Sequence, residues 1–262
     1  MNLQAMNDTK NKISLKLFNH HLFWIFLLLI SYFFIYSEVI LKTQYIRHDA
    51  LNFYGLYKYM IEGIQNAEIP FWDIYSLCGT PFYPSIPLIG LLDPLVFITA
   101  FTQKVFGQSS LDSYLTFYLL RAFIAVVGTY LFLYKLTGSK KSAFTGALLF
   151  FFAFLPSFHL QNGSINSFYL TPLALLFFLS ILDRIKNKKN CYLSMLLFTF
   201  TCGVIVNVFI PTYFTFYFIV FLIALFFSCF YQFKEVFNYF NNKEKRGVLF
   251  VCCCLILLFL IP

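Results

Sequence analysis

Long apolar runs separated by short polar segments dominate the chain. The runs lie at Leu22–Leu41, Ile86–Phe106, Leu111–Tyr134, Ser142–His159, Asn166–Leu182, Cys191–Ile210, Thr212–Phe233 and Val248–Pro262. A helix rises about 1.5 Å per residue and a bilayer core is roughly 30 Å thick, so a run of about 20 apolar residues can cross it. The pattern therefore predicts an all-α fold, a polytopic bundle of transmembrane helices.

The composition points the same way. Hydrophobic residues make up 60% of the 262 positions and charged residues only 11%, whereas soluble domains average about 25% charged. The net charge of +8 does not predict a nucleic-acid partner, because lysine and arginine in such proteins mark cytoplasmic loops. The seven cysteines show neither a CxxC pair nor zinc-ligand spacing. No cofactor motif is present.

The distribution of basic residues decides whether Ile86–Phe106 crosses the membrane. If it crosses, the basic segments 135–141 and 184–189 both fall outside, against the positive-inside rule. If it lies on or re-enters the outer surface, 14 of the 19 basic residues collect in four cytoplasmic regions. Pro87 and Pro94 also suit a broken interfacial segment better than a straight span. We therefore expect seven crossings.

This topology divides the chain into a cytoplasmic N-terminal tail, residues 1–21, and a transmembrane domain, residues 22–262. An extracytoplasmic loop covers about residues 42–110. The last run, from Val248, has 15 residues and would reach only about 22 Å. We expect the chain to be the N-terminal part of a longer protein in the cell membrane.

The outer loop carries the main candidates for chemistry. Asp49 follows the first apolar run by about eight residues and has two cationic neighbours, Arg47 and His48. A carboxylate at this position can act as a general base toward a hydroxyl acceptor. The alternative is a solvated loop aspartate. A metal bound by Asp49 and Asp73 is chemically conceivable, but no ligand spacing supports it, and none is predicted.

Aromatic and polar side chains supply further candidates. Trp72 and Tyr75 are flat and partly polar, which suits either a sugar face or the headgroup region of a membrane. His159 lies at the second outer turn, where it could contact a substrate or cap a helix. Both interpretations of each residue remain open.

Arg121 lies within an apolar run, about ten residues from its outer end. An arginine near the bilayer centre costs roughly 2.5–3.5 kcal/mol on insertion scales and usually faces a cavity or a partner. Its guanidinium could hold a lipid-linked phosphate or pair with Glu38.

Four short motifs in the outer loop resemble the bacterial YfhO-like membrane proteins. They are His48-Asp49-Ala50, the segment from Pro70 to Tyr75, Gly79-Thr80-Pro81 and Asp93-Pro94. That family is similar to the GT-C glycosyltransferases. The resemblance implies a large first outer loop with membrane-lying helices, and a polyprenyl-phosphate-linked sugar as donor. It also implies a catalytic aspartate at Asp49 and a cell-envelope glycopolymer such as teichoic acid as acceptor. One departure is His48, where the pattern has glycine.

Three functions follow as hypotheses. The first is an integral-membrane glycosyltransferase, with Asp49 as the base and with Arg47, His48, Arg121, Trp72, Tyr75 and His159 as candidate ligands of the donor phosphate or the substrate. The second is a flippase for lipid-linked saccharides, which performs no chemistry. The third is an assembly subunit. Polar residues gather near one face while most apolar runs stay apolar, which favours the transferase over the flippase.

Overall fold

The computed structural model describes residues 21–41, 49–68, 72–73, 80–81, 93–153 and 169–208. Within these ranges, only the backbone is described at residues 49–52, 72–73, 80–81, 153 and 206–208. The expected all-α class is confirmed. The helices are His21–Ile35, α2 (Ser37–Ile40), α3 (Asp49–Gln65), α5 (Pro94–Phe106), α6 (Ser110–Thr137), α7 (Lys140–Ala153), α9 (Thr171–Lys186) and α10 (Tyr192–Val208). Two short strands, β1 (Trp72–Asp73) and β2 (Thr80–Pro81), pair antiparallel.

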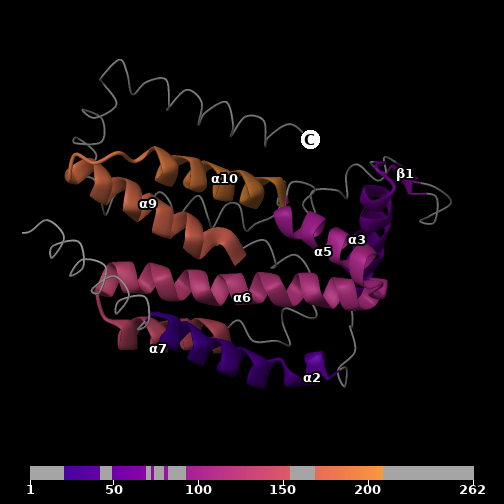
Figure 1. Ribbon diagram of the computed structural model, residues 1–262, viewed down its shortest axis with the longest axis horizontal. Helices are drawn as coiled ribbons and strands as arrows, with labels where there is room; N and C mark the ends of the chain where they lie inside the picture. Colours follow the sequence, from indigo (N-terminus) through magenta and orange to yellow (C-terminus); the bar gives the residue numbers. More distant parts are fainter. Residues whose placement is uncertain are drawn as a thin grey trace, which may run out of the picture.

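The 28-residue helix α6 is the centre of the described structure. Helices α9 and α10 cover one side of it, and α7 with the first helix and α2 covers the other (Figure 1). Helices α3 and α5 pack beside its N-terminal part. This arrangement gives α6 contacts along its whole length, and its buried residues run from Ser113 to Tyr130.

Contacts between helices fix their directions. Tyr32 of the first helix donates a hydrogen bond to the Leu119 carbonyl, while His21 lies against Tyr130, so the first helix runs antiparallel to α6. Lys135 of α6 forms an ion pair with Asp183 of α9, so these two helices end together. The same end therefore holds His21, the α6–α7 turn and the α9–α10 turn.

We call this the basic end of the bundle. Its described basic residues are Lys135, Lys140, Lys141, Arg184, Lys186, Lys188 and Lys189. The opposite, far end holds α2, α3, α5 and the start of α6 (Figure 1). The two basic segments that the sequence assigned to one side of a membrane thus lie at one end of the bundle.

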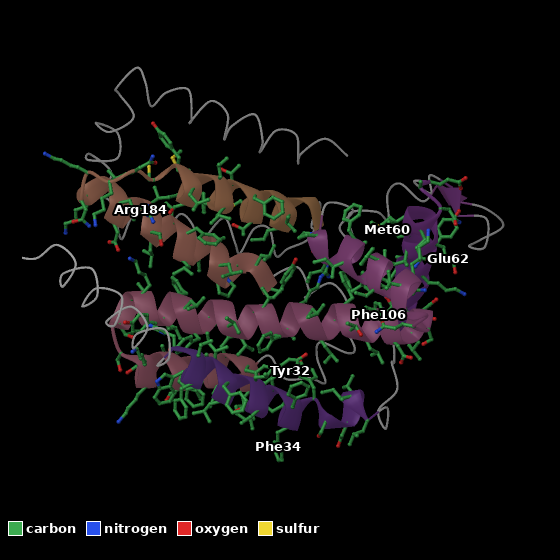
Figure 2. All side chains as sticks on the ribbon, viewed as in Figure 1. Tyr32, Phe34, Met60, Glu62, Phe106 and Arg184 are labelled. Carbon is green, nitrogen blue, oxygen red and sulfur yellow. The ribbon has the colours of Figure 1, made fainter. Side chains whose placement is uncertain are left out.

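Large apolar side chains cover much of the outer surface. On the first helix they form a stripe at Phe23, Phe26, Ile30 and Phe33, with Phe34 82% exposed. Figure 2 shows Phe34 directed away from the bundle, whereas Tyr32 faces α6. Similar stripes follow the outer faces of two other helices, at Phe97, Phe101 and Val105 of α5 and at Leu193, Leu196 and Phe200 of α10.

Among the described helices, α6 alone combines the length and apolar composition needed to cross a membrane. The core helix of a soluble protein meets the same two criteria, and the multi-pass topology stays a prediction. Helix α5 has 13 residues and is therefore about 20 Å long, shorter than the roughly 30 Å of a bilayer core.

The predicted apolar runs correspond closely to helices wherever the structure describes them. The first run differs, because its helix ends at Ile35 and a turn at Tyr36 separates it from α2. The ring of Tyr36 is buried against Tyr32 and Phe151 at that turn. The predicted spans Thr212–Phe233 and Val248–Pro262 lie outside the described residues.

Gly128 allows α6 and α9 to approach closely. A β-carbon at this position would lie 3.0 Å from Cγ of Leu173 and 3.5 Å from the Leu173 backbone nitrogen. Small residues serve this purpose at helix interfaces that must pack tightly. The contact seats the N-terminal part of α9 against α6, and with it Tyr169, which lies two residues before α9.

We expect Gly128→Leu to destabilise the fold by about 1–3 kcal/mol, because the added side chain overpacks the α6–α9 contact. Thermal unfolding of the purified protein in detergent measures the loss. Gly55→Leu is the matched control, since a β-carbon on Gly55 meets nothing within 4 Å. Equal melting temperatures for the two variants would contradict the assigned helix contact.

Candidate functional site

A buried ion pair connects α5 to α6 at the far half of the bundle. Arg121 is 3% exposed and Asp93 is fully buried. The arginine Nε and Nη2 atoms both donate to Oδ2 of Asp93, at 3.1 and 2.6 Å. This is a forked, charge-assisted contact, and such contacts are shorter and stronger than neutral hydrogen bonds.

The other carboxylate oxygen of Asp93 makes two further contacts. Its Oδ1 accepts a hydrogen bond from the Leu95 backbone N–H at 2.9 Å and one from the Tyr169 hydroxyl at 2.7 Å. Asp93 is therefore the N-cap of α5, and Pro94 follows at the first helical position, where its missing N–H costs nothing. One side chain thus joins the start of α5, the middle of α6 and the approach to α9.

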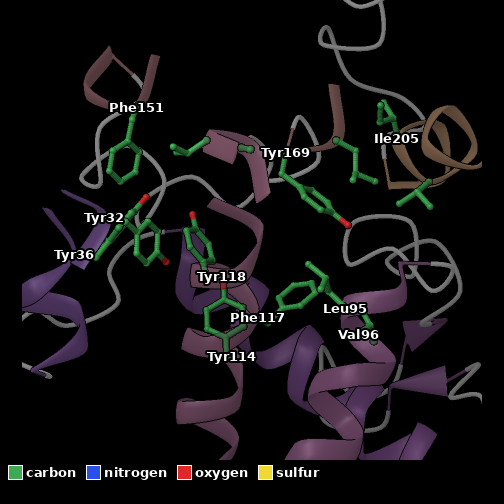
Figure 3. Packing of buried hydrophobic residues seen from close by; sticks show 14 of the residues in the cluster. Tyr32, Tyr36, Leu95, Val96, Tyr114, Phe117, Tyr118, Phe151, Tyr169 and Ile205 are labelled. Atoms are coloured by element: carbon green, nitrogen blue, oxygen red, sulfur yellow. The ribbon is translucent and has the colours of Figure 1, made fainter. Parts of the chain in front are cut away.

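Aromatic rings enclose the guanidinium. Its Cζ lies 4.0 Å from the centroid of the Phe117 ring and 5.2 Å from that of Tyr169. A cation over an aromatic face is stabilised by the ring quadrupole, more strongly when water is excluded. Figure 3 shows Phe117 and Tyr169 among the buried hydrophobic residues, with Leu95 of α5 close by. Asp93, Arg121 and Tyr169 with the Phe117 ring form what we call the clamp.

A second buried polar group ties α3 to the clamp region. The Tyr57 hydroxyl donates to Oγ1 of Thr99 at 2.8 Å and lies 2.9 Å from Oγ of Ser113. Thr99 in turn donates to the Leu95 carbonyl. Burial raises the pKa of Tyr57 above its ordinary value, against the weaker lowering effects of Ser113, Thr99 and Arg121. Tyr57 therefore stays a neutral hydroxyl, able to donate, throughout the physiological range.

Two more contacts complete the attachment of α3 to α5. Gln65 donates through Nε2 to the Ala100 carbonyl, and the Lys104 ammonium donates to the Gln65 carbonyl at 3.0 Å. Helices α3 and α5 consequently form one unit, which we call the α3–α5 unit. Its position on the bundle is fixed by the clamp and by the buried Tyr57 group.

The structure describes few of the predicted site residues. Arg121 is described fully. Asp49 is the first residue of α3 and Trp72 is in β1, but their side chains are outside the described set. Three others, Arg47, His48 and Tyr75, lie outside the described residues together with His159. Their assigned roles stay predictions.

For Arg121 the structure supplies a partner that the sequence interpretation did not consider. Its carboxylate partner there is Asp93, and the suggested contacts with Glu38 or a donor phosphate stay predictions. Asp93 engages Nε and Nη2 of the guanidinium. We therefore treat Arg121 as a positioning residue for α5.

Asp93 and Tyr169 were missed as site residues. Asp93 is 28 positions from Arg121 in the sequence, and Tyr169 is 76 positions from Asp93. The available signal was the dipeptide Asp93-Pro94 at the start of an apolar helix, which is typical of an N-cap. A buried arginine also requires a counter-charge, and Asp93 was one of the few acids near a helix start in the outer loop.

The carboxylate of the clamp is fully engaged. Both oxygens of Asp93 are used and its charge is balanced by Arg121, so the group holds helices together and presents no open nucleophile. Within the residues that the structure describes, no group of three or more metal-ligating side chains occurs.

No family model matches the chain, and neither the curated proteins nor the solved structures include a match.

Removing the arginine tests the clamp. Arg121→Met leaves Asp93 buried without its counter-charge, and we expect a loss of about 3–5 kcal/mol. Asp93→Asn in the same variant should restore part of the loss, because asparagine is neutral and still caps α5 through its side-chain oxygen. Thermal unfolding of the single and double variants measures the coupling. A double variant no more stable than Arg121→Met would show that the two charges are not coupled.

Proposed function

We propose that the protein is an integral-membrane glycosyltransferase of the GT-C type, which uses a polyprenyl-phosphate-linked sugar to modify a cell-envelope glycopolymer or lipid. The observation that carries the proposal is the polarity of the bundle. Apolar side chains lie outside, a charged pair lies inside, basic residues gather at one end, and the α3–α5 unit that begins with Asp49 is attached at the other.

The outer surface supports the membrane part of the proposal. Water-exposed helices normally show a polar outer face, and large contiguous apolar patches mark membrane or protein contacts. Here the first helix exposes Phe23, Phe26 and Phe34 by half or more. Buried polar residues such as Thr99, Thr129 and Thr201 donate to carbonyls of their own helices, as hydroxyls do inside apolar bundles.

The charge distribution supports a topology. Basic residues near helix ends favour the cytoplasmic side, which assigns the basic end to the cytoplasm and the α3–α5 unit to the outer surface. Helix α5 has an exposed apolar stripe at Phe97, Phe101 and Val105, which suits a helix that lies against lipid. This corresponds to the membrane-lying helices that the family resemblance implies.

The proposed chemistry is a displacement at the anomeric carbon of the donor sugar. Asp49 accepts the proton of the acceptor hydroxyl while the oxygen of that hydroxyl forms the new glycosidic bond to the anomeric carbon. The bond from the sugar to the polyprenyl phosphate breaks, and the phosphate leaves with the electron pair. Arg47 and His48 would stabilise the leaving phosphate, and the segment with Trp72 and Tyr75 would cover the sugar and exclude water.

Asp49 has a structural alternative that the experiments must separate from catalysis. It is the first residue of α3, and a negative charge in the first turn of a helix is stabilised by the helix dipole, typically by about 0.3–1 kcal/mol. A variant of Asp49 therefore needs a stability measurement beside the activity assay.

The topology predicts labelling from opposite sides. In a chain whose seven cysteines are replaced by alanine, Ser76→Cys should react with a membrane-impermeant maleimide on intact cells. Ser142→Cys, exposed at the basic end, should react only after permeabilisation. The reverse pattern would contradict both the topology and an extracytoplasmic reaction.

The base assignment predicts a loss of turnover. Asp49→Asn should lower sugar transfer by about 10²–10⁴-fold, the usual contribution of a general base, with at most a small change in melting temperature. The assay uses purified protein and a polyprenyl-phosphate sugar. Glu62→Gln is the control, because it neutralises an exposed acid of the same helix that forms only a surface pair with Lys58 at 3.8 Å.

The same assay separates the alternatives. Full transfer by the folded Asp49→Asn protein would exclude Asp49 as the base. Movement of the lipid-linked sugar across a vesicle membrane without turnover would indicate a flippase. The absence of both turnover and movement would indicate an assembly role.

A further inference from the structure

A pocket at the basic end gathers positive charge from two helices. It has a volume of about 250 Å³ and is lined by Lys135 of α6 and by Asp183, Arg184, Asn187 and Lys189 at the end of α9. Three basic side chains face one acidic one, so the lining has an excess of two positive charges. Its volume is just below the range of about 300–1,000 Å³ usual for small-ligand sites.

The turn after α9 gives this pocket a defined shape. The Lys189 backbone N–H donates to the Arg184 carbonyl, and that of Lys188 donates to the Ile185 carbonyl. These two bonds form a Schellman motif, in which the residue after the cap adopts a left-handed conformation. That residue is Lys188, with φ of 54°, where glycine is usual. The turn folds Lys189 back beside Arg184.

The same turn reduces the repulsion that an anion would meet at the end of α9. The end of a helix carries a partial negative charge from its unpaired carbonyls. Here the carbonyl of Asp183 accepts from the Asn187 backbone N–H and from its side-chain Nδ2, at 3.0 and 2.8 Å. The carbonyls of Arg184 and Ile185 are occupied as well. Three of the last four carbonyls of α9 are therefore engaged, and the basic side chains add positive charge beside them.

Donors remain for a ligand. Lys135 pairs with Asp183, which neutralises the single acid of the lining, and this pair is half exposed. Arg184 uses Nη1 to hold the Asn190 carbonyl at 2.8 Å, which fixes the guanidinium while other N–H groups of its five stay available. A fixed guanidinium beside an ammonium is a typical phosphate-binding pair.

The neighbourhood favours a lipid over a free phosphate. The exposed apolar stripe of α10 begins at Leu193, four residues after Lys189 in the sequence, and Leu193 is 64% exposed. Leu136, next to Lys135, is 54% exposed. An anionic headgroup in the pocket would therefore have apolar surface at hand for its acyl chains. Basic pockets between helices on the cytoplasmic side bind such headgroups in other membrane proteins.

We propose that the pocket formed by Lys135, Arg184 and Lys189 binds the phosphate of an anionic phospholipid. The proposal rests on the membrane placement in the proposed function and not on the transfer chemistry. The bound lipid bridges α6 and α9 at the basic end, opposite the clamp that joins them at the far end.

Titration with short-chain phosphatidylglycerol tests the site on purified protein in a zwitterionic detergent. We expect the lipid to raise the melting temperature at concentrations where phosphatidylcholine and inorganic phosphate do not. Lys189→Gln should weaken its affinity by about fivefold, the usual effect of one basic residue near a lipid surface, and Lys189→Arg should retain it.

Lys186→Gln is the matched control. It removes the same charge from the last turn of α9 but does not line the pocket. Equal weakening by Lys186→Gln would show diffuse attraction and overturn the site, as would an equal effect of phosphatidylcholine or no lipid effect. An equal effect of inorganic phosphate would overturn the lipid assignment. The Asp49→Asn protein should bind the lipid with unchanged affinity. The lipid site and the transferase proposal are therefore tested by different assays, and either can fail alone.

Discussion

A guanidinium inside an apolar helix requires a counter-charge, and the rest of the described fold is arranged so that Arg121 has one. One carboxylate oxygen of Asp93 accepts hydrogen bonds from the guanidinium. The other caps the start of α5 and accepts a hydrogen bond from the Tyr169 hydroxyl. Removing the arginine alone leaves Asp93 buried without its counter-charge, at a cost of several kcal/mol. The helix start of α5, the middle of α6 and the approach to α9 therefore depend on one carboxylate.

Much of the fold could be predicted from the sequence, because apolar runs of helical length leave little choice of structure. The run predicted at Leu111–Tyr134 is α6, and Gly138 ends that helix in the left-handed conformation that glycine favours. The turn at Tyr36 could not be read from the pattern, since an apolar run continues across it. The clamp was also missed, because hydrophobic periodicity carries no information about which acid, 28 residues away, reaches a buried arginine.

The candidate site was predicted less completely than the fold. Asp49, Trp72 and their neighbours were selected for chemical type and position after the first helix, which identifies a segment but fixes no geometry. The structure shows how α3, which begins at Asp49, is attached to the bundle. Tyr57, with its neutral hydroxyl, fastens α3 to Thr99 and Ser113, so the helix that begins at Asp49 is held by the same elements as the clamp. A catalytic group needs this kind of support, because small displacements of a reacting group cost rate.

The length of α6 between its two charged contacts shows how a membrane could accommodate the buried arginine. Lys135 and Arg121 are 14 residues apart on one continuous helix, which corresponds to about 21 Å of the roughly 30 Å bilayer core. If Lys135 lies at the cytoplasmic boundary, Arg121 lies well beyond the midplane, where the cost of a charge falls. The α6 residues before Arg121 then extend to the outer surface, at the level of α3 and α5. The ion pair would thus lie where the α3–α5 unit joins the bundle. One interaction would then both hold this unit in place and neutralise the arginine.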